Sequence, residues 1–183
     1  MYSILSFKST IIAAALLALP VSQAFAMTKV EYKADKSRIS ADYKADKKAC
    51  AAQSGNAKDI CVKEAKGKEK VARAELENTY VATDKNRNKV LVAKAESAYA
   101  IAKEKCDDKS GNDKDVCVKE AKAVEVKALA DAKMSKQIGA ARKEGADDKR
   151  DADYKVAAEK CDAMTGDAKT SCMNSAKAKF GKT

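Results

Sequence analysis

The spacing of the cysteines constrains this chain more than any other feature of its sequence. Ten residues separate the two members of each pair, and the first members lie 56 and 55 residues apart: Cys50/Cys61, Cys106/Cys117 and Cys161/Cys172. Residues 43–66 are identical to residues 99–122 at 14 of 24 positions, and to residues 154–177 at 10 of 24. The sequence therefore predicts a threefold internal repeat.

Each repeat is predicted to form a helical hairpin. The segment before the first cysteine is rich in Ala, Lys and Glu, which favour helices, and in the second repeat its apolar residues recur every three or four positions. A Ser-Gly-Asn or Thr-Gly-Asp turn follows, in which glycine supplies the positive φ of a helix end. The residue after this glycine is the predicted N-cap of the second helix, namely Asn56, Asn112 or Asp167. The expected fold is all-α, with three tandem hairpins.

The two cysteines of each pair are expected to form a disulfide that pins the hairpin. One ends the first helix, and the other lies opposite it across the turn, early in the second helix. Neighbouring cysteines become disulfides in an oxidising compartment, and a closed loop of about 12 residues contributes roughly 2.8 kcal/mol in the chain-entropy model. The alternative is a metal or thiol protein. Structural zinc sites use shorter spacings, often with histidine, and this chain has neither histidine nor a C-x-x-C motif.

Residues 1–26 are predicted to be a secretory signal peptide. Lys8 precedes an apolar run at positions 11–19, and a small-x-small cleavage site ends at Ala26. The run is shorter than the roughly 20 residues that a transmembrane helix needs, and no second run follows. We therefore expect a periplasmic or secreted protein that is cleaved after Ala26 and does not span a membrane.

The chain after the predicted signal peptide is poor in large apolar residues. Removal of 26 residues from 183 leaves 157, with 31 Ala and 31 Lys but only 19 Val, Ile, Leu and Phe together. This composition is typical of a disordered chain, or of a helical protein with a thin, Ala-rich core. Three disulfides can offset a core too thin to hold by itself, so we expect the chain to be folded.

The way in which the hairpins are joined is left open by the sequence. The predicted divisions are the signal peptide, 1–26, and three hairpin repeats, 27–82, 83–138 and 139–183. Helix propensity falls at 83–88 and again around Gly139 and Gly145. Breaks at both junctions would give about six helices. Continuous helices across both junctions would give four longer ones.

No catalytic, cofactor-binding or metal-ligating residue is predicted. The absence of histidine excludes the common nucleophilic triads and dyads, and no pair of carboxylates stands out, so we expect neither an enzyme nor a small-molecule substrate. An EF-hand alignment that places Gly111 at the sixth position puts cysteines where the first and last carboxylates belong. Four tyrosines are candidates for ligand stacking: Tyr32, Tyr43, Tyr99 and Tyr154. The last three each lie seven residues before the first cysteine of a pair, which favours core packing instead.

A basic excess suggests anionic partners. The whole chain carries 37 Lys and Arg against 27 Asp and Glu, and acidic residues are interspersed among the lysines, as on a solvated helix face. Three local clusters are candidate polyanion contacts: Lys44, Lys47 and Lys48; Lys63, Lys66, Lys68 and Lys70; and Lys177, Lys179 and Lys182. Lysine is a poor planar reader of phosphate, and nothing supports sequence-specific recognition of nucleic acid.

The signal segment and the motif CxxxSGNxKDxCVKEAK resemble those of a group of small, uncharacterised, Ala/Lys-rich secreted proteins of Gram-negative bacteria. The Ala/Lys/Glu composition is also similar to that of the helical stalk of the envelope protein TolA, which lacks this cysteine repeat. Neither resemblance implies an activity or site residues. We expect a non-enzymatic structural, protective or adaptor protein of the cell envelope, whose partner is an anionic envelope component or another envelope protein. The alternative is a cationic binder of lipopolysaccharide, anionic lipid, cell wall or nucleic acid.

Overall fold

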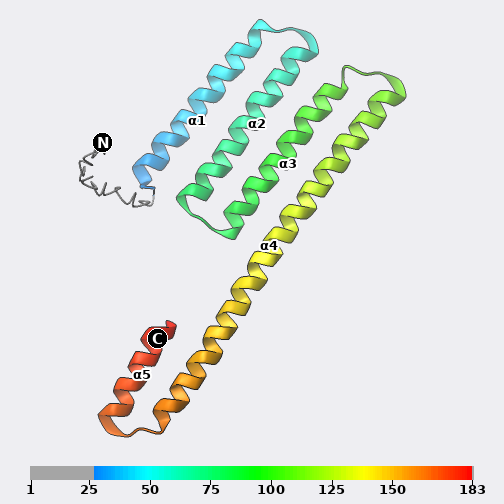
Figure 1. Cartoon of the computed structure of the whole chain (residues 1–183). Helices are drawn as coiled ribbons and strands as arrows, with labels where there is room; N and C mark the ends of the chain where they lie inside the picture. Colours follow the sequence, from blue (N-terminus) through cyan, green and yellow to red (C-terminus); the bar gives the residue numbers. More distant parts are fainter. Residues whose placement is uncertain (1–26, 183) are drawn as a thin grey trace, which may run out of the picture.

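The computed structural model describes residues 27–182, in which five α-helices and one short 3-10 helix are found and no strand (Figure 1). The elements are α1 (Lys29–Ala49), η1 (Cys50–Ala52), α2 (Gly55–Tyr80), α3 (Asp84–Cys106), α4 (Gly111–Asp162) and α5 (Gly166–Phe180). The predicted all-α fold with disulfide-pinned helices is confirmed. The predicted signal peptide, 1–26, lies outside the described residues.

The helices form a row that is one helix thick. Helices α1, α2, α3 and the first part of α4 lie side by side and antiparallel, and each contacts only its neighbours in the chain (Figure 1). Helix α4 extends well beyond α3, and α5 folds back against its far end on the side that α3 also occupies. At 1.5 Å per residue, the 52 residues of α4 span about 78 Å. The row therefore has two broad sides, both open to solvent.

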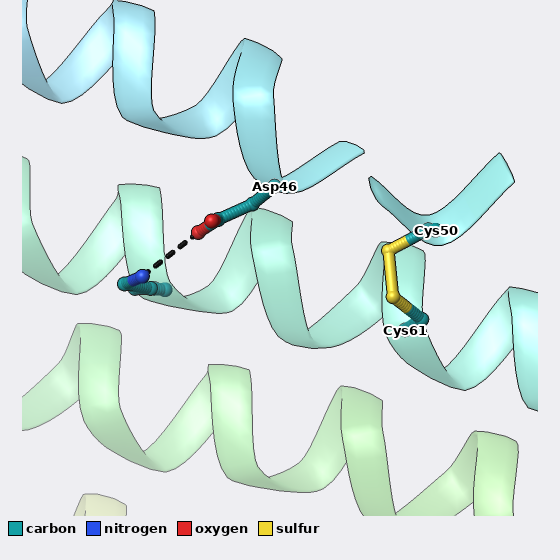
Figure 2. Close-up of a disulfide and its surroundings, with 4 residues drawn as sticks. Asp46, Cys50 and Cys61 are labelled. Carbon is teal, nitrogen blue, oxygen red and sulfur yellow. Dashed lines mark hydrogen bonds and ion pairs between the residues drawn. A yellow bond between two sulfur atoms is a disulfide. The ribbon is translucent and has the colours of Figure 1, made fainter. Parts of the chain in front are cut away.

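The three predicted disulfides are present and they close the three tight turns. Their Cα–Cα distances are 5.6, 5.7 and 5.6 Å, within the ordinary range for a disulfide. The first cysteine of each pair is only 1 % exposed, which makes these three the most deeply buried large side chains in the described chain: Cys50, Cys106 and Cys161. Figure 2 shows the Cys50–Cys61 bridge joining the end of the first hairpin arm to α2.

The turn glycines adopt the predicted left-handed conformation, but the predicted N-caps are wrong. Gly55 has φ of +55° and is itself the first residue of α2, so Ser54 occupies the cap position. The other two hairpins repeat this arrangement. Asn56 is therefore free for another contact, and its Nδ2 donates a hydrogen bond of 3.0 Å to the carbonyl oxygen of Glu104. The first turn is thereby tied to the end of α3.

The first junction between repeats is a break. Helix α2 ends at Tyr80, Val81 is extended, and the Thr83 hydroxyl accepts a hydrogen bond from the Asn86 amide at 3.1 Å. Asn86 Nδ2 in turn donates to the carbonyl oxygen of Val81 at 2.9 Å. The weak helix formers predicted to interrupt the chain thus lie just after the break, where they cap and begin α3.

The second junction does not break, so neither the six-helix nor the four-helix alternative is observed. Gly139 and Gly145 both lie inside α4, which is continuous. The residues between them are good helix formers without a Ser, Thr, Asn or Asp that could cap a new helix. Gly139 also has a packing role, because a Cβ there would lie 3.0 Å from Cγ of Asp84 at the start of α3. One junction of each kind gives five α-helices.

Gly145 offers a direct test of the continuous helix. A Cβ at this position would meet no atom within 4 Å, so we expect Gly145→Ala to stabilise the protein by about 1 kcal/mol through helix propensity alone. Gly139→Ala should gain less, because the Asp84 carboxylate has to move away. Thermal melts followed by circular dichroism measure both changes. A lower melting temperature for Gly145→Ala would mean that the chain turns at this point.

The core between the helices is as thin as the composition suggests. Apart from the cysteines, the buried apolar side chains are alanines and a single leucine: Ala65, Leu76, Ala93, Ala95, Ala132 and Ala176. The tyrosines are only half-buried or exposed, so they border this core rather than fill it. Tyr32 and Tyr80 pack against each other with ring centroids 4.6 Å apart. This contact holds the start of α1 against the end of α2.

Candidate polyanion-binding surface

The chemistry of a conventional active site is not visible in the part of the chain that the structure describes. All six cysteine sulfurs are bonded in pairs, which leaves no free thiol. No group of three or more Cys, Asp or Glu side chains within residues 27–182 is placed to hold a metal ion. Charge is therefore the property that distinguishes one part of this surface from another.

Helix α1 separates its charges onto two sides. Six exposed lysines, which we call the lysine face, occupy about 120° of its circumference at 100° per residue: Lys29, Lys33, Lys36, Lys44, Lys47 and Lys48. The four acidic residues occupy about 60° on another side of the helix: Glu31, Asp35, Asp42 and Asp46. The interspersion of charges in the sequence thus becomes a segregation once the helix forms.

The lysine face lacks internal partners. The ion pairs of α1 are Arg38 with Asp35, at 3.0 Å, and Asp46 with Lys68 of α2, at 2.8 Å. None of the six lysines has a carboxylate within 4.0 Å anywhere in residues 27–182. At 1.5 Å per residue, these six cations extend over about 28 Å of helix. The lysine face is therefore a continuous row of uncompensated positive charge.

The acidic side of α1 is directed toward α2. In Figure 2, Asp46 lies one turn before the Cys50–Cys61 bridge, and its dashed line marks the bond with Lys68. This bond raises the pKa of Lys68 above its ordinary value, because the carboxylate accepts a hydrogen bond from the ammonium group and attracts its charge. Asp46 thus joins α1 to α2, whereas Asp35 pairs within α1 and Glu31 caps it, and the six lysines remain available.

The orientation of the lysine face is fixed at both ends of α1. At the start, the Thr28 hydroxyl accepts a hydrogen bond from the Glu31 amide, and the Glu31 carboxylate accepts one from the Thr28 amide at 2.7 Å. The latter bond lowers the pKa of Glu31. At the other end, the disulfide holds Cys50 against α2. The capping bonds fix only where α1 begins; its orientation against α2 is set by the Tyr32–Tyr80 contact near its start and by the disulfide at its end.

Most lysines of the second predicted cluster are neutralised by neighbouring helices. Lys63 lies 3.4 Å from Glu104, Lys68 pairs with Asp46, and Lys70 pairs with Glu96. Only Lys66 has no ion pair within the described chain, and it is exposed. The structure thus uses this cluster largely to join α2 to its neighbours.

The C-terminal cluster is partly used for packing. Lys182 pairs with Asp151 of α4, and its Nζ lies 5.9 Å from the centroid of the Tyr154 ring. Lys179 Nζ lies 5.3 Å from the centroid of the Phe180 ring. Lys177 is half-buried and has no ion pair among residues 27–182. These contacts hold α5 on α4 and leave a weaker cationic surface than that of α1.

The structure therefore brings together one predicted cluster and adds to it. Lys44, Lys47 and Lys48 lie on the same side of α1 as Lys29, Lys33 and Lys36, which clustering along the sequence misses because they are several residues apart. The signal that identifies them is a spacing of three, four or eight residues, which keeps side chains on one side of a helix.

No protein-family model matches this chain, and no curated protein and no solved structure resembles it closely enough to support an assignment.

Proposed function

We propose that this protein is a non-enzymatic adaptor of the cell envelope that holds an anionic envelope component through the lysine face of α1. The observation that supports this proposal is the row of six exposed lysines without a carboxylate partner among residues 27–182. Each lysine near an anionic lipid surface contributes a favourable electrostatic energy, and these contributions add up along the row. Salt screens the attraction and weakens it. Binding by such point charges requires an extended polyanion rather than a particular small ligand.

The disulfides support a location outside the cytoplasm. All three have formed, and such bonds persist in oxidising compartments such as the periplasm or the extracellular space. No helix within the described residues is long and apolar enough to cross a membrane. Export to the periplasm or beyond is therefore part of the proposal.

The arrangement of the helices supports an adaptor. Helix α1 lies at one edge of the row, whereas α5 packs against the far end of α4 (Figure 1). An anionic component bound along α1 leaves that far end accessible to another envelope protein. Disulfides close the α1–α2 and α3–α4 turns, and Asn86 bonds across the α2–α3 turn, so the two regions are held apart by a fixed scaffold.

A charge-reversal variant tests the binding. The triple variant Lys33→Glu, Lys36→Glu, Lys44→Glu should bind anionic vesicles or lipopolysaccharide roughly a hundredfold more weakly, because three cations become repulsive. The unmodified protein should lose affinity steeply as salt is raised. Co-sedimentation across a salt series measures both effects, and circular dichroism verifies that the variant remains helical.

The matched control changes the net charge equally but elsewhere. Lys109, Lys127 and Lys149 are exposed and have no ion pair among residues 27–182, and none lies on α1. Their replacement by glutamate should weaken binding only by a few-fold. If this control loses as much affinity as the α1 variant, net charge alone explains binding; if the unmodified protein does not bind at low salt, the proposal fails.

A further inference from the structure

The two broad sides of the helical row carry different charges, and the side-chain contacts between neighbouring helices identify each side. On one side, Arg73 of α2 donates a hydrogen bond of 2.9 Å to Ser40 of α1. Ser40 lies between Lys36 and Lys44 along the lysine face, one helical turn from each. The side on which this bond lies is therefore the side of the lysine face, and we call it the cationic side.

The same side continues across α2 and α3. On α2, Lys70 precedes Arg73 by one turn and pairs with Glu96 of α3. Further along, Lys89 of α3 pairs with Glu77 of α2 at 2.7 Å. These cross-helix pairs lie on one side of the row because their members are three, four or seven residues apart on each helix.

Helix α4 can be placed in the same way. Nζ of Lys122 lies 4.9 Å from the centroid of the Tyr99 ring, and Tyr99 is three residues after Glu96 on α3. Lys122 also pairs with the buried Glu125 of its own helix. The side of α4 on which Lys122 lies is thus continuous with the cationic side.

Six further exposed lysines lie on the cationic side, because helical spacing places them on the same side of their helices as Lys70, Lys89 or Lys122. They are Lys66 on α2, Lys85 and Lys103 on α3, and Lys119, Lys133 and Lys136 on α4. None of them has an ion pair among residues 27–182. With the lysine face, they make twelve uncompensated cations distributed over four adjacent helices. Several acids of the cationic side are paired, as Glu69 is with Arg73 at 2.8 Å, whereas two exposed acids, Asp59 and Asp115, have no ion pair among residues 27–182, so lysines outnumber free acids on this side by twelve to two.

The opposite side of the row is acidic. Its cross-helix contacts are Lys68 with Asp46, Lys94 with Glu75 at 2.8 Å, and Lys105 with Glu64 at 3.2 Å, so most basic residues of this side are paired. Lys127 of α4 is the exception, and against it stand four acids without an ion pair among residues 27–182: Asp42 of α1, and Asp113, Glu120 and Asp131 of α4. The helical row therefore has opposite charge on its two broad sides.

We propose that the protein docks with the whole cationic side of the row on a planar anionic lipid surface. This inference rests on the proposed function and names its partner. A layer one helix thick presents all twelve lysines at once only to a surface that is itself extended in two dimensions, and the acidic side would be repelled by the same surface. A linear polyanion would need only the row of lysines along α1.

The first test uses lysines far from α1. The triple variant Lys85→Glu, Lys119→Glu, Lys133→Glu should bind vesicles of phosphatidylglycerol and phosphatidylcholine roughly a hundredfold more weakly. Its binding to heparin, a soluble linear polyanion, should change by less than about threefold. The triple variant of Lys109, Lys127 and Lys149 is again the matched control, since Lys127 lies on the acidic side of α4 with Glu120 and Asp131, and thermal melts establish that all variants are folded.

The second test reports orientation directly. The chain has no tryptophan. Two of the exposed valines of α4 lie on its opposite sides: Val126 is 53 % exposed on the cationic side, and Val124 is 63 % exposed on the acidic side. With vesicles present, tryptophan fluorescence of the Val126→Trp variant should be shielded from a water-soluble quencher. The Val124→Trp variant should be quenched as strongly as without vesicles.

The outcomes separate this inference from the proposed function. If the Lys85/Lys119/Lys133 variant binds vesicles as the control does, while the α1 variant does not bind, the docking is along α1 alone and the inference is wrong. Equal losses on vesicles and heparin would also overturn it, since the partner would then be any polyanion. If vesicles protect both tryptophans or neither, the proposed orientation is wrong. If every variant binds vesicles as strongly as the unmodified protein, both the proposed function and the proposed docking are wrong.

Discussion

Removal of the third disulfide, by Cys161→Ser with Cys172→Ser, is expected to release α5 from the rest of the protein. Helix α5 has 15 residues, of which only Ala176 is buried, and isolated helices of this length are marginal in water. The bridge closes a loop of about 12 residues, which contributes roughly 2.8 kcal/mol in the chain-entropy model. The few contacts of α5 with α4 do not replace that contribution.

Hydrogen exchange measured by mass spectrometry should show loss of protection over residues 166–180, while α2 and α3 remain protected. Circular dichroism should lose a fraction of helical signal that corresponds to α5. The matched comparison is Cys106→Ser with Cys117→Ser, because α3 also packs against α2 and should stay helical with a lower melting temperature. Full protection of 166–180 without the bridge would show that packing alone holds α5.

A large side chain at Gly67 is expected to force α2 and α3 apart. Gly67 is buried, and a Cβ at this position would lie 3.1 Å from Cβ of Ser97 and 3.5 Å from Cδ1 of Ile101. The Ser97 hydroxyl also donates a hydrogen bond of 3.4 Å to the Gly67 carbonyl oxygen. Leucine cannot fit without displacing a helix, so Gly67→Leu should destabilise the protein by about 3 kcal/mol.

Chemical denaturation measures the loss, and Gly145→Leu is the matched control. Both glycines lie inside helices, but a Cβ at Gly145 would meet no atom within 4 Å, so leucine there should be neutral or stabilising. Gly67→Ala should fall between them, since its gain in helix propensity is offset by the close contact with Ser97. Equal stability of both leucine variants would mean that α2 and α3 do not approach each other this closely.

The hairpins could be predicted from the sequence because their determinants are local. Cysteine spacing, the turn glycines and helix-forming composition all act within one repeat, and each of them led to the observed disulfides and helices. The break before Thr83 had a local signal too, since Thr83 and Asn86 form a cap. The continuity of α4 through Gly139 had no such local signal. Two glycines weaken a helix, but they do not specify whether the chain turns there or stays helical.

The charge separation could not be read from clusters along the chain. Lys29 and Lys48 are far apart in sequence, and only the helix brings them onto one side. Contacts between helices are still harder to predict from the sequence. Whether Lys70 has an ion pair depends on Glu96, 26 residues away, and thus on the register of α2 against α3. That register is set by close contacts of small residues such as Gly67 with Ser97, which composition does not reveal.

The arrangement of helices in which each contacts only its chain neighbours has a consequence for how the molecule unfolds. Without a shared core, stability is close to a sum over adjacent pairs, as in repeat proteins. Loosening one pair then divides the molecule into two parts that can each remain ordered, and melting proceeds inward from the terminal helices. Such a protein withstands local damage by shortening its ordered region instead of collapsing as a whole.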